Sequence, residues 1–169
     1  MAMMNSLPSM LRSLIVLGAA AVALAVPTVA AADTTKQATA SMKIEGKQVS
    51  AAAWGRHLVV EFLTILQRDD PVPALTTFLD PAFQIQRANG SREDKASYLA
   101  NPARFGDFEV SGYRVTRGGT IIVASFSIAA KETIDGVVYR KTPAPRIATF
   151  RFDTGSWTLI SYGNFNAPS

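Results

Sequence analysis

A few side chains of this 169-residue sequence have types and spacings that suit acid–base chemistry. His57 is the only imidazole, and Glu61 lies four residues after it. On a helix, residues four apart lie side by side, so Glu61 would orient the ring of His57 as a base. The same spacing also suits a solvated helix face, which is the more common use of such a pair. Asp107 is a third acid–base candidate.

Carboxylates and phenols can together transfer a proton next to a carbonyl group. A buried carboxylate with a raised pKa abstracts the proton, and a phenol stabilises the oxyanion. The phenols of the sequence are Tyr98, Tyr113, Tyr139 and Tyr162, and the carboxylates near the ends of predicted elements are Asp80, Asp107 and Glu109. Tyrosines are also ordinary strand residues, and acids are ordinary at loop ends. Their spacings match no catalytic motif, so we assign no catalytic residue.

Six residues are expected to give a pocket its shape. They are Trp54, Phe83, Arg87, Phe126, Tyr162 and Phe165. Arg87 shares a strand face with Phe83, so it would either hold a carboxylate at the mouth of the pocket or extend to water. For the aromatic residues, ordinary core packing is the competing interpretation.

The composition argues against several classes of protein. One histidine and no cysteine argue against a zinc site, because such sites draw mainly on these two residue types, and no cofactor is expected. The net charge of +4 is not concentrated in one basic stripe, so nucleic-acid binding is not expected. Basic residues do crowd the second half of the chain, either as an anion-binding surface or as the wet face of a sheet. They are Arg114, Arg117, Arg140, Lys141, Arg146 and Arg151.

The N-terminus reads as a secretory signal over residues 1–32. Residues 14–26 form an apolar run, and Ala30 and Ala32 give the small-x-small pattern of a cleavage site before Asp33. The run is shorter than the ~20 residues that span a bilayer, although an uncleaved anchor is the alternative. We expect a periplasmic or secreted protein that is not membrane-bound after cleavage, and a flexible lead-in over residues 33–48.

The first half of the mature chain predicts helices and one strand. Apolar residues at spacings of three and four predict a helix over 50–67, with Ser50 as its N-cap. A short helix over 73–79 starts with proline in its first turn. Alternating residues then predict a strand over 83–87.

A turn after this strand leads into a third helix, which ends before Pro102. Ser91 is its expected N-cap. Ala96 and Leu99 are expected to face inward, with Tyr98 on the flank.

From residue 107 the pattern is that of β-strands. Turn pairs separate four strands, and they stand at Gly118-Gly119, Asp135-Gly136 and Thr154-Gly155. Pro143 and Pro145 predict a bulge or interruption within the third strand. Helices followed by a meander of four strands predict an α+β fold, with the helices on one face of an antiparallel sheet.

This order of elements resembles the NTF2-like, or SnoaL-like, superfamily, and most of all its small bacterial "nuclear transport factor 2 family" proteins. The likeness is carried by "LTTFLDPAFQIQRANGSREDKASYL", "YRVTRGGTIIVASFSI" and "GSWTLISYGNFN". It covers roughly residues 50–166, within a domain over 49–166. The resemblance implies a strongly curved sheet that wraps against the helices as a cone, whose open end is a pocket.

Relatives of this kind include isomerases, cyclases, hydratases and epoxide hydrolases, while others bind only ligands or partners. We expect a domain that binds a small apolar or amphipathic ligand, or a protein partner, through the cone or the sheet. A homodimer through the outer face of the sheet is one such partnership. The alternative is a cofactor-independent enzyme of the isomerase or hydratase type. A buried acid beside a pocket tyrosine would favour the enzyme, and a pocket filled by side chains would favour binding or assembly.

Overall fold

The computed structural model describes the domain that follows the expected signal. The described residues are 42–44, 46–139 and 141–166, so the expected signal over 1–32 lies outside them. The end of the expected lead-in forms a small hairpin of β1 (Lys43–Ile44) and β2 (Lys47–Gln48), where the sequence predicted no regular structure. Within the described ranges, no helix is long and apolar enough to cross a membrane.

Two helices open the domain as the sequence predicted. α1 spans Ala51–Leu66, and the side chain of its N-cap Ser50 accepts a hydrogen bond from Ala53 N at 3.2 Å. α2 spans Val72–Phe78, with a proline in its first turn. The apolar stripe predicted from the spacing is buried at Gly55, Leu58, Val59, Phe62, Ile65 and Leu66, and Leu63 is buried as well, which the spacing did not indicate.

The third helix begins later than predicted. β3 (Leu79–Gln86) pairs with β4 (Arg92–Asp94), and α3 (Lys95–Ala100) follows. Because residues 92–94 continue the sheet, the N-cap is Asp94, whose Oδ1 accepts a hydrogen bond from Ser97 N at 2.8 Å, and the prediction of Ser91 was wrong.

The inward face of α3 also differs from the prediction. Tyr98 is fully buried and packs on Phe83 with 5.5 Å between ring centroids, whereas Ala96 is exposed. The hairpin that precedes α3 fixes its orientation, and this is not visible in the apolar spacing of the helix alone.

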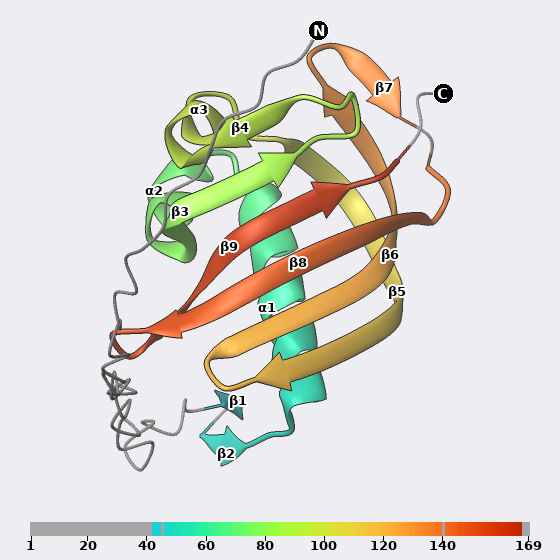
Figure 1. The fold of residues 1–169 in the computed structure, drawn as a ribbon. Helices are drawn as coiled ribbons and strands as arrows, with labels where there is room; N and C mark the ends of the chain where they lie inside the picture. The colour runs from blue at the N-terminus through green and yellow to red at the C-terminus, as the bar shows by residue number, and fades with distance from the viewer. Residues whose placement is uncertain (1–41, 45, 140, 167–169) are drawn as a thin grey trace, which may run out of the picture. The chain divides into compact units, whose positions relative to one another are not determined.

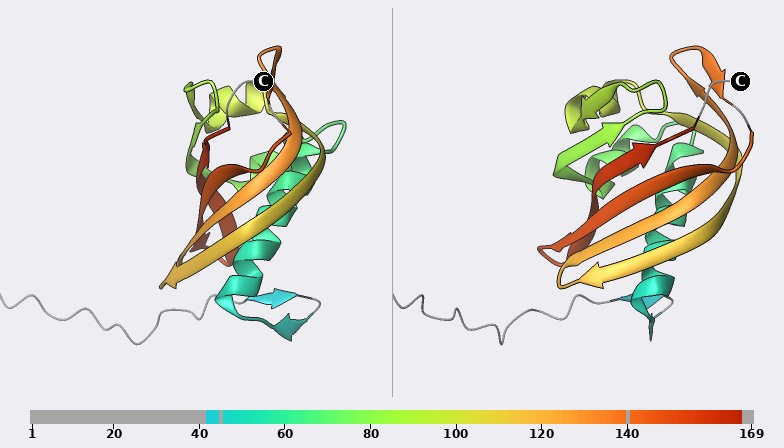
Figure 2. Two further views of the ribbon diagram at one scale, coloured as in Figure 1. Left: turned by 90° about the vertical axis from the view of Figure 1, so that its right-hand side faces the viewer. Right: turned by 45° about the vertical axis from the view of Figure 1, so that its right-hand side comes forward.

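The remaining strands complete a curved sheet, which curls around α1 in Figures 1 and 2. They are β5 (Arg104–Gly118), β6 (Ile121–Ile134), β7 (Val137–Tyr139), β8 (Ala144–Asp153) and β9 (Ser156–Asn164). The strand order is β4-β3-β9-β8-β6-β5, and β7 pairs with β6. All pairs are antiparallel except β3 with β9, which are parallel. The predicted α+β architecture is confirmed.

The predicted turns lie at the strand junctions. Asp135 and Gly136 have φ of 50° and 80° and join β6 to β7, as expected of the strongest turn signal in the chain. The interruption predicted near the prolines separates Tyr139, the last residue of β7, from Ala144, the first of β8.

α1 packs chiefly on β5 and β6, and a glycine permits its close approach. A Cβ atom on Gly55 would lie 2.6 Å from Cγ1 of Val115 and 3.3 Å from Cγ2 of Ile122. The contact with Val115 is shorter than real carbon atoms allow and the one with Ile122 is tight, so a side chain at Gly55 would force its neighbours to move.

A buried carboxylate ties β3 to β8 and β9. Asp80 accepts hydrogen bonds from Ala82 N at 2.8 Å, from Thr158 Oγ1 at 2.9 Å and from Arg151 Nη2 at 2.9 Å. Burial raises the pKa of Asp80, but these hydrogen bonds and the charge of Arg151 outweigh it, so that the pKa is lowered. Asp80 therefore stabilises the fold above the unfolded-state pKa of about 3.9, and this contribution is lost as pH falls through the lower folded pKa.

Candidate functional site

Six polar side chains gather on the inner face of the sheet, toward the end where α3 and β7 lie. They come from α3, β6, β8, β9 and the residue that follows β3, and each residue is 6% exposed or less. We call this set the buried polar cluster: Arg87, Tyr98, Glu132, Arg146, Tyr162 and Asn164. Charged residues are rarely buried unless they are paired, so the arrangement of their partners decides what the cluster can do.

The centre of the cluster is an ion pair between neighbouring strands. Arg146 Nη2 lies 3.2 Å from Glu132 Oε2, and Asn164 Nδ2 donates to Glu132 Oε1 at 2.7 Å. Arg146 Nη1 also donates to Pro145 O at 2.9 Å. Both oxygens of Glu132 are therefore hydrogen-bonded, which compensates for the removal of its charge from water.

A second ion pair closes one side of the cluster. Arg87 Nε lies 2.7 Å from Glu93 Oε1, and Arg87 Nη2 donates to Glu93 Oε2 at 3.0 Å and to Asn101 O. Its guanidinium carbon stands 5.2 Å from the ring centroid of Tyr98, within cation–π distance. Arg87 thus fixes both the end of α3 and the ring of Tyr98.

The two tyrosines of the cluster are neutral hydrogen-bond donors. Burial raises the pKa of Tyr98 and of Tyr162 far above the usual range for phenols, although Arg87 and Arg146 partly oppose the shift. Within the described part of the chain, neither hydroxyl has an acceptor for its proton. Arg146, the cationic neighbour of the Tyr162 hydroxyl, is itself only a donor.

Aromatic rings form an apolar wall beside these hydroxyls. Tyr162 packs on Phe62 with 5.1 Å between ring centroids and on Phe126 with 6.5 Å, and Tyr98 packs on Phe83. The interior between α1 and the sheet thus has an apolar body and one polar end, which is the pattern of many small-molecule sites.

The structure brings together four of the six residues expected to shape a pocket, and these are Phe83, Arg87, Phe126 and Tyr162. Trp54 lies elsewhere, on α1, with its ring 4.9 Å from that of His57. Phe165 follows β9 and is exposed.

The three acid–base candidates do not join the cluster. His57 Nε2 and Glu61 Oε2 are 3.8 Å apart, as their spacing indicated, but their side chains are 41% and 45% exposed. Asp107 is exposed where the β5–β6 register shifts between Phe105 and Phe108. No group of three or more His, Cys, Asp or Glu side chains within the described ranges could hold a metal ion.

The sequence did hold a signal for the residues that were missed. Glu132 is two residues beyond the buried Ala130, and Arg146 lies between the buried Ala144 and Ala148. Alternation along a strand puts residues two apart on one face, so both charges share the inward face. Reading Arg146 as part of a wet face was wrong for this reason.

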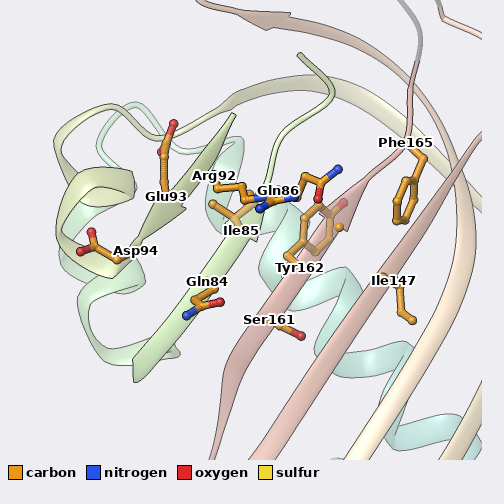
Figure 3. A pocket seen from close by; sticks show the side chains of 11 residues that line it. Gln84, Ile85, Gln86, Arg92, Glu93, Asp94, Ile147, Ser161, Tyr162 and Phe165 are labelled. Carbon is orange, nitrogen blue, oxygen red and sulfur yellow. The ribbon is translucent and has the colours of Figure 1, made fainter. Parts of the chain in front are cut away.

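A second concave region, the outer groove, lies on the other face of the sheet (Figure 3). Its volume is about 650 Å³. The side chains that matter below come from four neighbouring strands and the residue after β9: Gln84, Gln86, Arg92, Ile147, Ser161 and Phe165.

Comparisons with solved structures identify the fold. An NTF2-like protein from Cytophaga hutchinsonii is 15% identical with a TM-score of 0.59, over 72% of this chain and all of that one. A candidate Ca/calmodulin-dependent kinase II association domain from Exiguobacterium sibiricum is 14% identical with a TM-score of 0.55, over 73% of this chain and 98% of that one. A candidate ketosteroid isomerase from Parabacteroides distasonis is 14% identical with a TM-score of 0.53, over 76% of this chain and 96% of that one.

No protein-family model matches the sequence, and no curated protein does. The chain has the NTF2-like fold, in which a curled sheet and its helices form a cone, as the order of its elements indicated. Because identities near 15% leave function open, the activity has to be argued from the side chains of this chain.

Proposed function

We propose that this domain binds a small amphipathic molecule inside the cone, with an oxygen acceptor of the ligand at the buried polar cluster. The observation that supports this is the pair of buried hydroxyls of Tyr98 and Tyr162, whose protons have no acceptor among the described residues. Arg146 adds a third donor group next to them. A carbonyl or carboxylate oxygen complements such a set of donors, and the rings of Phe62 and Phe126 suit an apolar body.

The energetic gain from such a ligand is substantial. A buried donor without an acceptor costs about 1–3 kcal/mol, and a ligand oxygen that accepts from both phenols recovers part of that cost. An analogue of the ligand that lacks this oxygen leaves the hydroxyls of Tyr98 and Tyr162 without an acceptor, so it recovers none of the cost. Binding is therefore expected to discriminate strongly for the oxygen.

Ligand entry requires the end of the cone near α3 and β7 to open. Asp135, at the β6–β7 tip, accepts from Asn89 Nδ2 at 3.1 Å and from Asn101 Nδ2 at 3.2 Å. These two bonds tie the tip to the β3–β4 turn and to the end of α3, which Figure 1 shows at the same end of the sheet. Both bonds are exposed, so water competes with them and opening costs little.

A matched pair of bicyclic probes tests this function. We expect 2-tetralone to bind the domain at least about tenfold more tightly than tetralin, which has the same skeleton without the oxygen, since tenfold corresponds to about 1.4 kcal/mol. Tyr162→Phe and Tyr98→Phe should each reduce this ratio severalfold, because each removes one donor. Isothermal titration calorimetry at one protein concentration measures all the affinities.

Tyr113→Phe is the matched control, because Tyr113 is a half-buried phenol of β5 that lies outside the cluster, against Arg56. It should leave the ratio unchanged. Equal affinities for the ketone and the hydrocarbon, or a ratio that survives both cluster substitutions, would refute an oxygen-specific site in the cone.

A second function is proton transfer by a cofactor-independent isomerase, and one observation favours it. Glu132 is buried near both phenols, since its charge raises the pKa of Tyr98 and of Tyr162. The likeness to a candidate ketosteroid isomerase adds support. Against it, Arg146 and Asn164 already occupy both oxygens of Glu132. Conversion of a β,γ-unsaturated ketone to its conjugated isomer, abolished by Glu132→Gln in a folded protein, would establish this second function.

We also propose that the chain is exported and cleaved between Ala32 and Asp33. The apolar run over 14–26 and the small residues Ala30 and Ala32 support this. The exported fraction is expected to have an intact mass that starts at Asp33, and a mass that retains residues 1–32 would contradict it. A homodimer through the sheet stays a prediction, supported by the likeness to an association domain.

A further inference from the structure

We propose that the outer groove is a second binding site, independent of the cone, and that its ligand is a small amphipathic organic anion. The ligand carries a carboxylate or sulfonate at one end and an aryl or alkyl body at the other. The argument rests on how four strands place their outward side chains in one row.

Strand register creates this row. Arg92 of β4 is opposite Gln86 of β3, Gln86 is paired with Gly163 of β9, and Gly163 is opposite Ile147 of β8. Strands lie about 4.8 Å apart, so three steps give a row about 14 Å long. The groove therefore has a defined length, a cationic end at Arg92 and an apolar end at Ile147.

The apolar end is built around a missing side chain. A Cβ atom on Gly163 would lie 3.0 Å from Cγ2 of Ile147 and 3.1 Å from Cε2 of Phe165, so the phenyl ring lies close over bare backbone. Ile147 and Phe165 are nevertheless 40% and 54% exposed. Figure 3 shows these two side chains next to each other at one end of the groove. They offer an apolar contact that the chain itself does not cover.

The polar end has unused hydrogen-bonding groups. Within the described part of the chain, the side chains of Gln84, Gln86, Arg92 and Ser161 have no hydrogen bond or ion pair. In Figure 3 the side chain of Arg92 extends toward Gln86 and into the groove. A guanidinium with neighbouring carboxamides fits a carboxylate or sulfonate, because both anions accept several hydrogen bonds at once.

The nearby acids do not neutralise this arginine. Asp94, two residues further along β4, points toward α3 and accepts the hydrogen bond from Ser97 N. Hydrogen bonds from Ser97 lower the pKa of Asp94, so it keeps its charge at the helix terminus. Glu93 pairs with Arg87 on the inner face. Glu93 and Asp94 also line the groove, but each is engaged with another residue, so Arg92 is the charged lining residue that has no hydrogen bond or ion pair among the described residues.

The dimensions favour a small molecule over a second copy of the chain. A volume of about 650 Å³ lies within the usual range for small-ligand sites. In a symmetric dimer, each groove would meet the same groove of its partner. Arg92 of both copies would then lie in the interface, where charged side chains are depleted.

Two fluorescent probes that differ by one group test the proposal. The probe 8-anilinonaphthalene-1-sulfonate carries the anion, and N-phenyl-1-naphthylamine has the same aromatic body without it. The sulfonate is expected to bind at least fivefold more tightly, and Arg92→Gln should reduce its affinity about five- to tenfold while leaving the neutral probe within twofold. Phe165→Ser should weaken both probes, because it removes the shared apolar contact.

Control variants locate the site. Arg114→Gln removes an exposed arginine of β5, and Val60→Ser removes an exposed apolar side chain of α1, so neither should change either affinity. Tyr98→Phe, a change in the cone at a residue that does not line the groove, should also leave sulfonate binding unchanged, and 2-tetralone should not compete with it. These last two results separate the groove from the cone, so either site can fail without the other.

Three results would overturn the proposal. The first is equal binding of the two probes, and the second is sulfonate binding that Arg92→Gln does not weaken. The third is a dimer in sedimentation equilibrium that both Arg92→Gln and Ile147→Asp dissociate, because the groove would then be an interface between copies. Decanoate that competes for the sulfonate probe, in a protein whose oligomeric state Arg92→Gln and Ile147→Asp leave unchanged, supports the small-anion site.

Discussion

Replacement of Arg146 with methionine is expected to lower the free energy of unfolding by about 3–5 kcal/mol, the usual cost of removing one partner of a buried ion pair. Methionine has a similar length but no charge, so Glu132 keeps its charge in the interior with Asn164 as its remaining hydrogen-bond donor. Urea unfolding monitored by circular dichroism measures the change, with the same dependence of the unfolding free energy on urea concentration in both proteins.

The double variant Arg146→Met/Glu132→Leu separates lost charge pairing from lost packing. It should regain most of the stability, because two apolar side chains in place of a buried ion pair are often neutral or better. Arg104→Met is the matched control: Arg104 is exposed and donates only to Arg68 O and Asp69 O, so its loss should cost about 1 kcal/mol or less. If the double variant is as unstable as the single one, the unpaired charge of Glu132 does not cause the loss of stability in Arg146→Met.

Gly55→Val is expected to destabilise the domain by about 2–3 kcal/mol, the usual scale for overpacking of a tight core. Its Cβ atom would lie 2.6 Å from Cγ1 of Val115, so α1 has to move away from β5. The gain in helix propensity over glycine, about 0.5 kcal/mol, offsets little of this. The midpoint of thermal unfolding reports the loss.

Relief by a second substitution identifies the cause. Val115→Ala removes the atoms that the new side chain would meet, so Gly55→Val/Val115→Ala should be more stable than Gly55→Val alone. Gly106→Val is the matched control, because no atom lies within 4 Å of a Cβ at Gly106 and its effect should stay within about 0.5 kcal/mol. If the two glycine positions respond alike, the contact with Val115 is not responsible.

Local signals predicted most of the fold. Ser50 as a cap, the apolar stripe of α1 and the turn at Asp135 depend on neighbours within a few residues, and the structure confirms each one. The start of α3 was predicted wrongly, because pairing of residues 92–94 with β3 competes with the cap at Ser91. The outcome of this competition depends on strand pairing, so the sequence of the helix alone does not predict it.

The candidate site was predicted less well than the fold. Phe83, Phe126 and Tyr162 were expected near a pocket and do lie together. Glu132 and Arg146 were not proposed for the site, because a charge in an antiparallel strand usually faces water. Their pairing depends on the curvature of β6, because the β6–β8 register places Arg146 opposite Phe126, while Glu132 lies six residues further along β6, opposite Tyr139 of β7.

The parallel pairing of β3 with β9 determines when this chain can fold. The hydrogen bond from Thr158 to Asp80 links residues 78 positions apart, and strand β9 is the last element of the chain. Long-range parallel pairing is slow, because the loop must close before its contacts form. The β3–β9 pairing cannot form until β9 has been synthesised, so we expect this chain to stay unfolded for longer than one whose strands pair only with close neighbours in sequence. For a protein that crosses a membrane as an unfolded chain, as proposed above, that delay preserves its competence for translocation.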